Sequence, residues 1–321
     1  MSTHDWSAAI IASRESLLVL SRCISSIFLA STGKKVIIDV IVNGNLSLAQ
    51  EVSCHIQSLF PVESGSSIRV WSIPFADKAH ALNSYIHHIW QEGKFTYFLD
   101  GYVAVKNNAL LFIENGLEEA RDALAASGVP SCGRSAATLR KMMLTRGGLH
   151  GNLFAIRDSV MRELKRRSFK LPLGLYRTDS LIGAVLNFNL DPAKYRWDSS
   201  RILVHPGATW DIPTSKWWRF KDVRTHSRRI VRQAQGVLEN AAVRDHLAIR
   251  KIVPEDLPSN VEDLVLNWIS NNPQQARRLF QRQPLTFYAA RKLRKRKDWS
   301  DAGLSPNLLY EMSSAKYALS N

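Results

Sequence analysis

Cysteine is scarce in this chain, which holds three thiols, Cys23, Cys54 and Cys132, in 321 residues. Three scattered cysteines cannot build a disulfide framework, and no C-x-x-C pair or Cys/His cluster indicates a zinc site. We therefore expect the protein to reside in the cytoplasm, where thiols stay reduced.

Long apolar runs and glycine-rich phosphate loops are also missing. The apolar stretch over residues 7–30 is interrupted by Arg14, Glu15 and Arg22, whereas a membrane-spanning helix needs about 20 mostly apolar residues. We expect neither a signal peptide nor a membrane span. Without G-x-G-x-x-G at the first helix or G-x-x-x-x-G-K-[ST] anywhere, a dinucleotide-binding fold and a P-loop are not supported.

The composition is that of a globular protein with a strong charge asymmetry. Apolar residues make up 45% and charged residues 22% of the chain, which allows one large or two small domains. Residues 1–160 carry a net charge of +1, and residues 161–321 carry +14. The second half is expected to meet an anionic partner, namely nucleic acid, acidic lipid headgroups or a phosphate-bearing substrate. The alternative is a basic surface that only confers solubility.

Short apolar runs alternate with longer amphipathic stretches over the first hundred residues, a pattern typical of βαβ units. The predicted strands are 8–12, 36–42, 67–73 and 95–99, and the predicted helices start at Ser16 and cover 46–59 and 77–90. This alternation predicts an α/β fold with a mostly parallel sheet covered by helices on both faces. Because right-handed crossovers bring the strand-to-helix loops to one edge of such a sheet, ligands are expected to bind there.

After residue 100, the sequence pattern predicts a less regular order of strands and helices. A helix is expected near 107–126, and the Gly-, Ser- and Arg-rich segment 128–148 is expected to be a mobile loop. Strands are predicted over 152–156 and 201–205. One helix is predicted over 158–167, a second begins at Thr178, and a third ends at about Asn240. A helical tail interrupted by Pro254, Pro258 and Pro273 follows.

Seven short segments between residues 8 and 238 carry the most informative pattern. They are Ile10–Arg14, Asn43–Asn45, Asp77–Asn83, Phe98–Val103, Gly148–Arg157, Thr178–Asp179 and Arg232–Gly236. Their order and spacing resemble the motifs of GT-A glycosyltransferases of the family 2 type. The resemblance implies a Rossmann-like sheet flanked by helices, and inverting transfer of one sugar from a nucleoside-diphosphate sugar, expected to be a UDP-sugar, to an acceptor hydroxyl. Cell-surface polysaccharide or glycolipid synthesis would be the setting.

The same resemblance divides the chain into three parts. Residues 1–106 would form the nucleotide-sugar-binding half and residues 107–240 the acceptor-binding half of the GT-A domain. Residues 241–321 would form a basic helical C-terminal extension. The chain reads Arg229–Gln233 where processive relatives carry Q-x-x-R-W, so transfer of single sugars is expected rather than polymer synthesis.

The resemblance also assigns donor-binding positions across the strand-end loops and the late helix. These are Ser13, Glu15, Asn43, Lys78, Asp100, Tyr102, Arg228, Arg229 and Arg232. Asn43 stands where the family has an aspartate that contacts the base. Its side-chain oxygen could accept a hydrogen bond from uracil N3–H, or its NH₂ group could donate to another base. The alternatives to donor binding are structural: Asp100 would be an ordinary turn residue, and the arginines would lie on a solvent-exposed helix face.

A divalent metal, Mn²⁺ or Mg²⁺, is doubtful as a cofactor. Tyr102 stands where the D-x-D box usually has its second aspartate, and a neutral phenol is a poor ligand for hard cations. Asp100 and His205 are the candidate metal ligands, although a lone histidine at a strand end is more often structural. Guanidinium and ammonium groups could instead neutralise the leaving diphosphate.

Asp179 is the candidate general base, since it matches the family's Glu-Asp position at the start of a helix. The alternative is a carboxylate that caps this helix. Trp217 and Trp218 are candidates for an acceptor platform or for core packing.

The tail over residues 277–297 interleaves basic groups with large apolar side chains. This pattern favours peripheral contact with an anionic membrane on its inner face, and it would suit a lipid-linked acceptor as well as a carbohydrate one. Nucleic acid is the weaker alternative, because no nucleic-acid-binding motif accompanies the charge. A further alternative, suggested by Tyr102, is a catalytically weakened GT-A-like protein that binds a nucleotide sugar or a protein partner.

Overall fold

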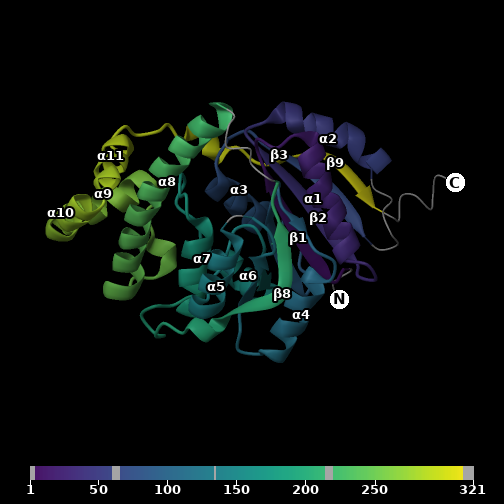
Figure 1. Ribbon diagram of the computed structural model, residues 1–321, viewed down its shortest axis with the longest axis horizontal. Helices are drawn as coiled ribbons and strands as arrows, with labels where there is room; N and C mark the ends of the chain where they lie inside the picture. The colour runs from purple at the N-terminus through teal and green to yellow at the C-terminus, as the bar shows by residue number, and fades with distance from the viewer. Residues whose placement is uncertain (1–3, 60–65, 134, 214–219, 314–321) are drawn as a thin grey trace.

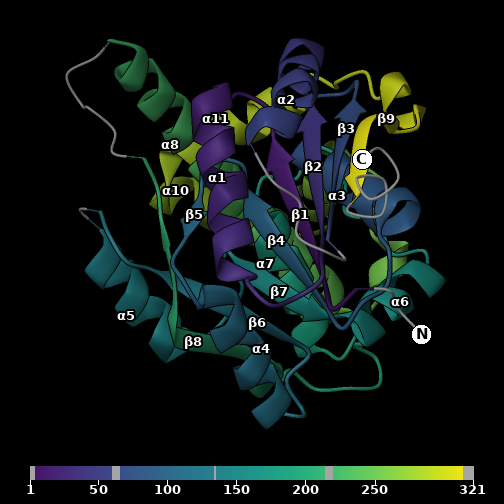
Figure 2. The ribbon, with the colours of Figure 1, turned by 90° about the vertical axis from the view of Figure 1, so that its right-hand side faces the viewer.

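The computed structural model describes residues 4–59, 66–133, 135–213 and 220–313. Within this part of the chain, nine strands form one sheet in the order β5-β8-β6-β7-β4-β1-β2-β3-β9. Helices cover both faces of the sheet (Figures 1 and 2), so the predicted α/β class is confirmed. No helix among these residues has the length and apolarity that crossing a bilayer requires.

The strands are β1 (Trp6–Ala12), β2 (Val36–Asn43), β3 (Ser67–Ile73), β4 (Phe95–Asp100), β5 (Ala104–Val105), β6 (Ala125–Pro130), β7 (Phe154–Arg157), β8 (Ile202–Asp211) and β9 (Asn307–Ser313). The helices are α1 (Leu17–Ala30), α2 (Leu46–Leu59), α3 (Lys78–Ser84), α4 (Ala109–Glu119), α5 (Ala136–Arg146), α6 (Asp158–Arg166), α7 (Thr178–Asn187), α8 (Phe220–Arg244), α9 (Val261–Asn271), α10 (Pro273–Arg282) and α11 (Pro284–Leu293).

A parallel block of four strands sets the direction of the ligand edge. β3, β2, β1 and β4 lie side by side and all run the same way. Their carboxyl ends at Ala12, Asn43, Ile73 and Asp100 therefore meet at one edge, as the sequence predicts. β6 and β8 also pair in parallel, while β7, β5 and β9 each pair antiparallel to their neighbours.

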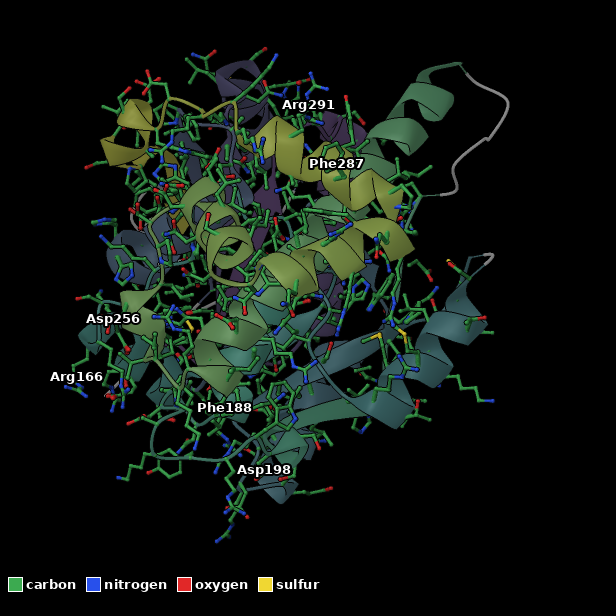
Figure 3. All side chains as sticks on the ribbon, turned by 90° about the vertical axis from the view of Figure 1, so that its left-hand side faces the viewer. Arg166, Phe188, Asp198, Asp256, Phe287 and Arg291 are labelled. Atoms are coloured by element: carbon green, nitrogen blue, oxygen red, sulfur yellow. The ribbon has the colours of Figure 1, made fainter. Side chains whose placement is uncertain are left out.

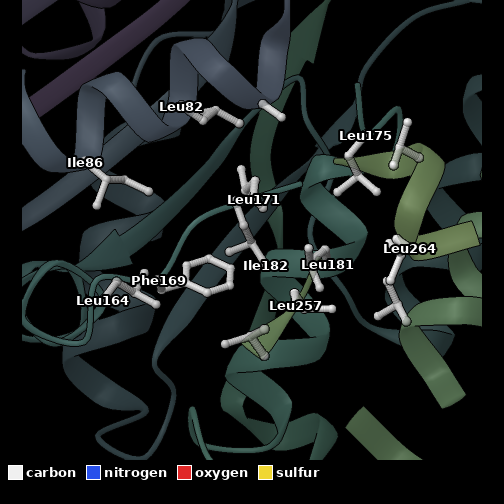
Figure 4. Packing of buried hydrophobic residues seen from close by; sticks show 14 of the residues in the cluster. Leu82, Ile86, Leu164, Phe169, Leu171, Leu175, Leu181, Ile182, Leu257 and Leu264 are labelled. Carbon is white, nitrogen blue, oxygen red and sulfur yellow. The ribbon is translucent and has the colours of Figure 1, made fainter. Parts of the chain in front are cut away.

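The core consists of two apolar layers, one on each face of the sheet. Along β1 the side chains alternate, because successive residues of a strand point to opposite faces. Ala8 and Ile10 belong to the layer under α1, α2 and α4, whereas Ala9 and Ile11 belong to the layer under α3, α6, α7 and α8. Figure 4 shows part of the second layer, where Phe169 lies among leucine and isoleucine side chains from α3, α6 and α7.

The prediction of a mobile loop over residues 128–148 is wrong. The segment contributes the second half of β6 and the whole of α5. Small residues serve close packing here: a side chain at Gly128 would come within 2.6 Å of the carbonyl oxygen of Ala208 on β8. Gly128 is thus required by the close approach of β6 and β8, although a glycine in the sequence resembles a loop signal.

The predicted helices near 107–126 and over 77–90 are both shorter than expected. The first ends at Glu119, which leaves room for β6. The second changes at Ser84 into a π-helical turn, η1 (Tyr85–Ile89), so that α3 itself has only seven residues.

The C-terminal segment adds a strand that the sequence analysis does not predict. β9 pairs antiparallel with β3, with Val70 opposite Tyr310 and Ile68 opposite Met312. It covers the hydrogen-bonding edge that β3 would otherwise expose. The division of the chain into three parts stays a prediction, but residues 307–313 are joined to the N-terminal part of the sheet.

A buried ion pair joins β2 to β3. The guanidinium of Arg69 donates two hydrogen bonds to the carboxylate of Asp39, at 2.7 and 2.9 Å, and Trp71 Nε1 donates a third at 2.9 Å. Asp39 is fully buried and Arg69 is 5% exposed. The pair closes its hydrogen bonds internally, which is the condition under which a buried charge is tolerated.

We expect Arg69→Met to lower the free energy of unfolding by about 3–5 kcal/mol, because it leaves the Asp39 carboxylate buried without its partner. Urea denaturation followed by circular dichroism measures this loss. Arg162→Met is the matched control, since Arg162 pairs with Glu92 on the surface and its removal should change stability little. Equal effects of the two substitutions would contradict the role of the buried pair.

Candidate active site

The loop after β1 is held in shape by one of its own carboxylates. Glu15 accepts hydrogen bonds from the backbone N–H groups of Ser13 and Arg14, at 2.6 and 2.8 Å. The predicted donor residues Ser13 and Glu15 therefore lie together at the ligand edge, and the described contacts of Glu15 are structural.

The loop after β2 is tied to the end of β1. Asn43 is 4% exposed and its side-chain amide donates to the carbonyl oxygen of Ala12 at 2.8 Å. Gly44 has a φ of +66°, and a side chain there would come within 2.2 Å of Cβ of Ala76. Only glycine fits this turn. The amide group of Asn43 is thus engaged with backbone, so its predicted contact with a base rests on its oxygen.

Lys78, Asp100 and Tyr102 form the centre of the candidate site. The ammonium of Lys78, at the start of α3, forms an ion pair and hydrogen bond with Oδ1 of Asp100, at the end of β4. The hydroxyl of Tyr102 donates to Oδ2 of Asp100 at 3.1 Å and lies 3.0 Å from the side-chain oxygen of Asn152. Both oxygens of Asp100 therefore already have partners.

Asp179 reaches the same place from α7. Its Oδ2 accepts from the backbone N–H of Gly151 at 2.9 Å, and its Oδ1 accepts from the N–H of Ser180 at 3.0 Å. A Cβ atom on Gly151 would lie 3.0 Å from Nζ of Lys78 and 3.7 Å from a carboxylate oxygen of both Asp100 and Asp179. The structure thus brings the predicted base and the predicted donor residues around one glycine.

The electrostatics of the site follow from this convergence. Burial would lower the pKa of Lys78, but the carboxylates of Asp100 and Asp179 outweigh it and raise that pKa above its ordinary value. Burial beside Asp100 raises the pKa of Tyr102, which stays a neutral phenol. The pKa of His150 is lowered by burial, although Asp179 and Asp100 partly offset the effect. At neutral pH the site therefore holds an ammonium, a phenol and a neutral imidazole.

Asp179 is positioned by a residue of α8 that the sequence does not single out. Glu239 is fully buried and accepts hydrogen bonds from the backbone N–H groups of Tyr176 and Arg177, each at 3.0 Å, and from the Gln235 amide at 2.8 Å. These N–H groups lie at the start of α7, where a carboxylate also complements the helix dipole. Glu239 thus satisfies the N–H groups just before α7, while Asp179 itself accepts from the first-turn N–H of Ser180.

The chain leading to α7 is fixed along α3. The Asn83 side chain exchanges two hydrogen bonds with the backbone of Leu171, at 2.8 and 2.9 Å. Asp77 caps α3 by accepting from His80 N at 2.8 Å and also accepts from Gly174 N at 3.1 Å. Part of the motif over 77–83 therefore serves to position other segments, while Lys78 alone among these three reaches Asp100.

The three arginines of α8 that are predicted to bind the donor differ in what the structure describes of them. Arg229 and Arg232 are exposed, and Arg229 is near enough to act electrostatically on Tyr102, where it opposes the rise of the phenol's pKa. The Arg228 side chain lies outside the described residues, as do Trp217 and Trp218. Their predicted roles stay predictions.

His205 lies away from the other candidates in the contacts that the structure describes. Its ring stacks on Phe112 of α4, with centroids 5.3 Å apart, and its Nδ1 accepts from the N–H of Gly207 at 3.1 Å. Its described neighbours belong to α4 and β8, and Asp100 is not among them. The structural role considered for His205 agrees better with this position than metal binding does.

The residues around Asp100 do not fit a divalent metal as they are arranged. Hard cations need several carboxylate or water oxygens, yet one oxygen of Asp100 is paired with an ammonium and the other receives a phenol proton. Among the described residues, no three His, Cys, Asp or Glu side chains are grouped as a metal site would require. The positive charge at this position comes from Lys78.

Sequence reasoning missed four contributors, namely Gly151, His150, Asn152 and Glu239. The first three belong to the segment Gly148–Arg157, which the resemblance marked without assigning roles, so a signal for them existed. Glu239 carries no such signal, because a single glutamate in an amphipathic helix is ordinary.

Comparison with known proteins gives a likeness of fold. The sequence matches no protein-family profile, and it matches no curated protein. The mannosyltransferase PcManGT from Pyrobaculum calidifontis, in complex with GDP-Man and Mn²⁺, superimposes with a TM-score of 0.53 at 14% identity, over 90% of this chain and 84% of that chain. TarS 1–349 from S. aureus, in complex with UDP-GlcNAc, gives 0.49 at 13% identity, over 90% and 80%. At 14% identity the first likeness shows a shared fold alone.

We expect Glu239→Gln to lower the free energy of unfolding by about 1–3 kcal/mol. The NH₂ group of the new amide would face one of the N–H groups that Glu239 now accepts from, and that N–H group would lose its acceptor. The amide hydrogens of Tyr176 and Arg177 should exchange faster, which hydrogen–deuterium exchange can localise. Glu51→Gln, at an exposed position on α2, should leave both measurements unchanged. Unchanged exchange at 176 and 177 in the Glu239 variant would rule out its role in holding the start of α7.

Proposed function

We propose that the chain is a glycosyltransferase that takes a sugar from a nucleoside diphosphate and passes it, with inversion, to an acceptor hydroxyl. The observation that carries the proposal is the convergence of Lys78, Asp100 and Asp179 on Gly151 at the carboxyl edge of the parallel strands, with Tyr102 bonded to Asp100. This edge is where open α/β sheets bind their ligands. The fold shared with a mannosyltransferase agrees with this choice, but a fold alone does not decide a function.

In this proposal the donor diphosphate meets Lys78 first. Within the ion pair the Lys78 side chain is 33% exposed and the Asp100 side chain 17% exposed, so an anion that approaches from solvent encounters the ammonium. Arg229 and Arg232 add positive charge from α8. These fixed cations would neutralise the charge that grows on the diphosphate as the bond to the sugar breaks.

Asp179 is the proposed general base. The acceptor oxygen attacks the anomeric carbon from the side opposite the diphosphate, the bond to the diphosphate breaks, and the hydroxyl proton passes to the Asp179 carboxylate. The hydrogen bond from Gly151 and the anchoring of α7 by Glu239 hold this carboxylate in place. Asp100 positions Lys78 and Tyr102 rather than a metal.

The family resemblance suggests the donor and the acceptor. A UDP-sugar is the first candidate donor, with a GDP-sugar as the comparison, and single transfer to a carbohydrate or a lipid-linked acceptor is the proposed outcome. A second candidate function is a weakened GT-A-like protein that binds a nucleotide sugar without transferring it. The observation in its favour is the Lys78–Asp100–Tyr102 arrangement, which occupies the usual position of the metal carboxylates.

A transfer assay with a matched pair of aspartate variants tests the proposed base. Asp179→Asn should reduce turnover of the donor by at least about a hundredfold, since a positioned base contributes about 10²–10⁴ in rate. Release of nucleoside diphosphate from a panel of UDP- and GDP-sugars measures it. Asp122→Asn, at an exposed aspartate, should behave as wild type. Donor binding without release by the wild-type protein would favour the second candidate, and no binding of any nucleotide would remove both.

Removal of metal tests the role of Lys78. Titration calorimetry should show that UDP or GDP binds in the presence of EDTA as well as it binds in the presence of Mn²⁺. Lys78→Gln should weaken this binding at least about tenfold, because it removes a charge-assisted contact worth about 1.5–3 kcal/mol. Lys35→Gln, an exposed lysine before β2, is the control.

A variant that rebuilds the second aspartate of the box gives the opposite test. Tyr102→Asp should make binding of the diphosphate dependent on Mn²⁺, because it adds a carboxylate next to Asp100. Binding by the wild-type protein only with Mn²⁺ would disprove the metal-free site while leaving a nucleotide-dependent function intact.

A further inference from the structure

The segment 273–297 has an unusual composition. It contains nine Lys and Arg residues and no Asp or Glu. It forms α10, α11 and the turn that follows, and the two helices lie on the side of the molecule opposite β9 (Figure 1).

α11 is anchored to the protein by one face only. Thr286, Ala289, Ala290 and Leu293 are buried at the helical spacing of one stripe. Three large apolar side chains point elsewhere: Leu285 is 48%, Phe287 is 55% and Tyr288 is 56% exposed. Figure 3 shows Phe287 on this outward side, with Arg291 one turn further along the helix.

A small groove lies beside these exposed side chains. Its volume is about 210 Å³, and Phe280 and Phe287 meet edge to face within it at a centroid distance of 5.6 Å. Its apolar walls are completed by Ile269 and Ala290, and Arg291 and Arg294 supply its charge. In the part of the chain that the structure describes, neither arginine forms an ion pair, whereas Arg296 is bonded to Asp263 and Lys297 lies over Phe75.

We propose that this surface, the exposed face of α11 with the groove beside it, docks on an anionic phospholipid bilayer. Leu285, Phe287 and Tyr288 would enter the boundary between headgroups and acyl chains, as the apolar face of an interfacial helix does. Arg291 and Arg294 would pair with headgroup phosphates, which guanidinium groups bind bidentately. The basic residues around them add attraction to the negative surface potential.

The apolar side chains favour a bilayer over a nucleic acid. A polynucleotide would explain the charge, and Phe287 and Tyr288 could stack on bases. Leu285 has no aromatic face for stacking and gains nothing from phosphates, whereas it gains by leaving water in a bilayer. Nucleic acid is therefore the competing outcome of the test. The proposal is independent of the glycosyltransferase activity.

Co-sedimentation of the full chain with vesicles tests the proposal. Binding is expected to vesicles that contain phosphatidylglycerol, and not to vesicles of phosphatidylcholine alone. Leu285→Ser with Phe287→Ser, and separately Arg291→Gln with Arg294→Gln, should each weaken partitioning at least about tenfold. Because these side chains are exposed or at a rim, the variants should melt like wild type, which circular dichroism checks.

Matched controls come from other surfaces. Leu29→Ser replaces a leucine that is 66% exposed on α1, and Arg121→Gln replaces an exposed arginine after α4. Both should bind anionic vesicles as wild type does. The proposal fails if the α11 variants bind as well as these controls, if the two vesicle types bind equally, or if only single-stranded RNA, tested in parallel, is bound.

Discussion

One ion pair, between the Lys78 ammonium and the Asp100 carboxylate, is the interaction on which the candidate site depends. It joins the start of α3 to the end of β4, and it places a positive charge where carboxylates from β4 and α7 converge. Without that charge, Asp100 and Asp179 would repel each other across Gly151. Tyr102 completes the arrangement because its neutral hydroxyl can donate to Asp100, which a second carboxylate could not do.

The groups that hold this geometry are buried and come from distant parts of the chain. Glu239 on α8 fixes the start of α7, and Asn83 on α3 fixes the strand-like segment that precedes it. Each does so by satisfying backbone hydrogen-bonding groups that would otherwise be buried without partners. The position of Asp179 therefore depends on the anchoring of its helix by α8 and α3, and on the hydrogen bonds that its carboxylate accepts from Gly151 and Ser180.

Charge is distributed along the chain in two distinct ways. In the candidate site, the Lys78 ammonium pairs with the Asp100 carboxylate, and the Asp179 carboxylate acts on the same ammonium electrostatically. On α10 and α11, basic groups gather without acidic partners, next to apolar side chains that remain in water. In the part of the chain that the structure describes, the basic groups of α10 and α11 form no ion pairs, and such an excess of positive charge attracts a large anionic partner.

The sequence by itself determined the parallel block and its ligand edge, because the alternation of β-branched runs with amphipathic helices leaves few other arrangements. It also marked Lys78, Asp100, Tyr102 and Asp179 through short motifs. Only the tertiary structure decided that Asp100 pairs with Lys78, that Glu239 anchors α7, that residues 136–146 form the helix α5, and that β9 closes the edge of β3. Local patterns encode periodicity, but pairing between residues far apart in the chain depends on packing that no local pattern contains.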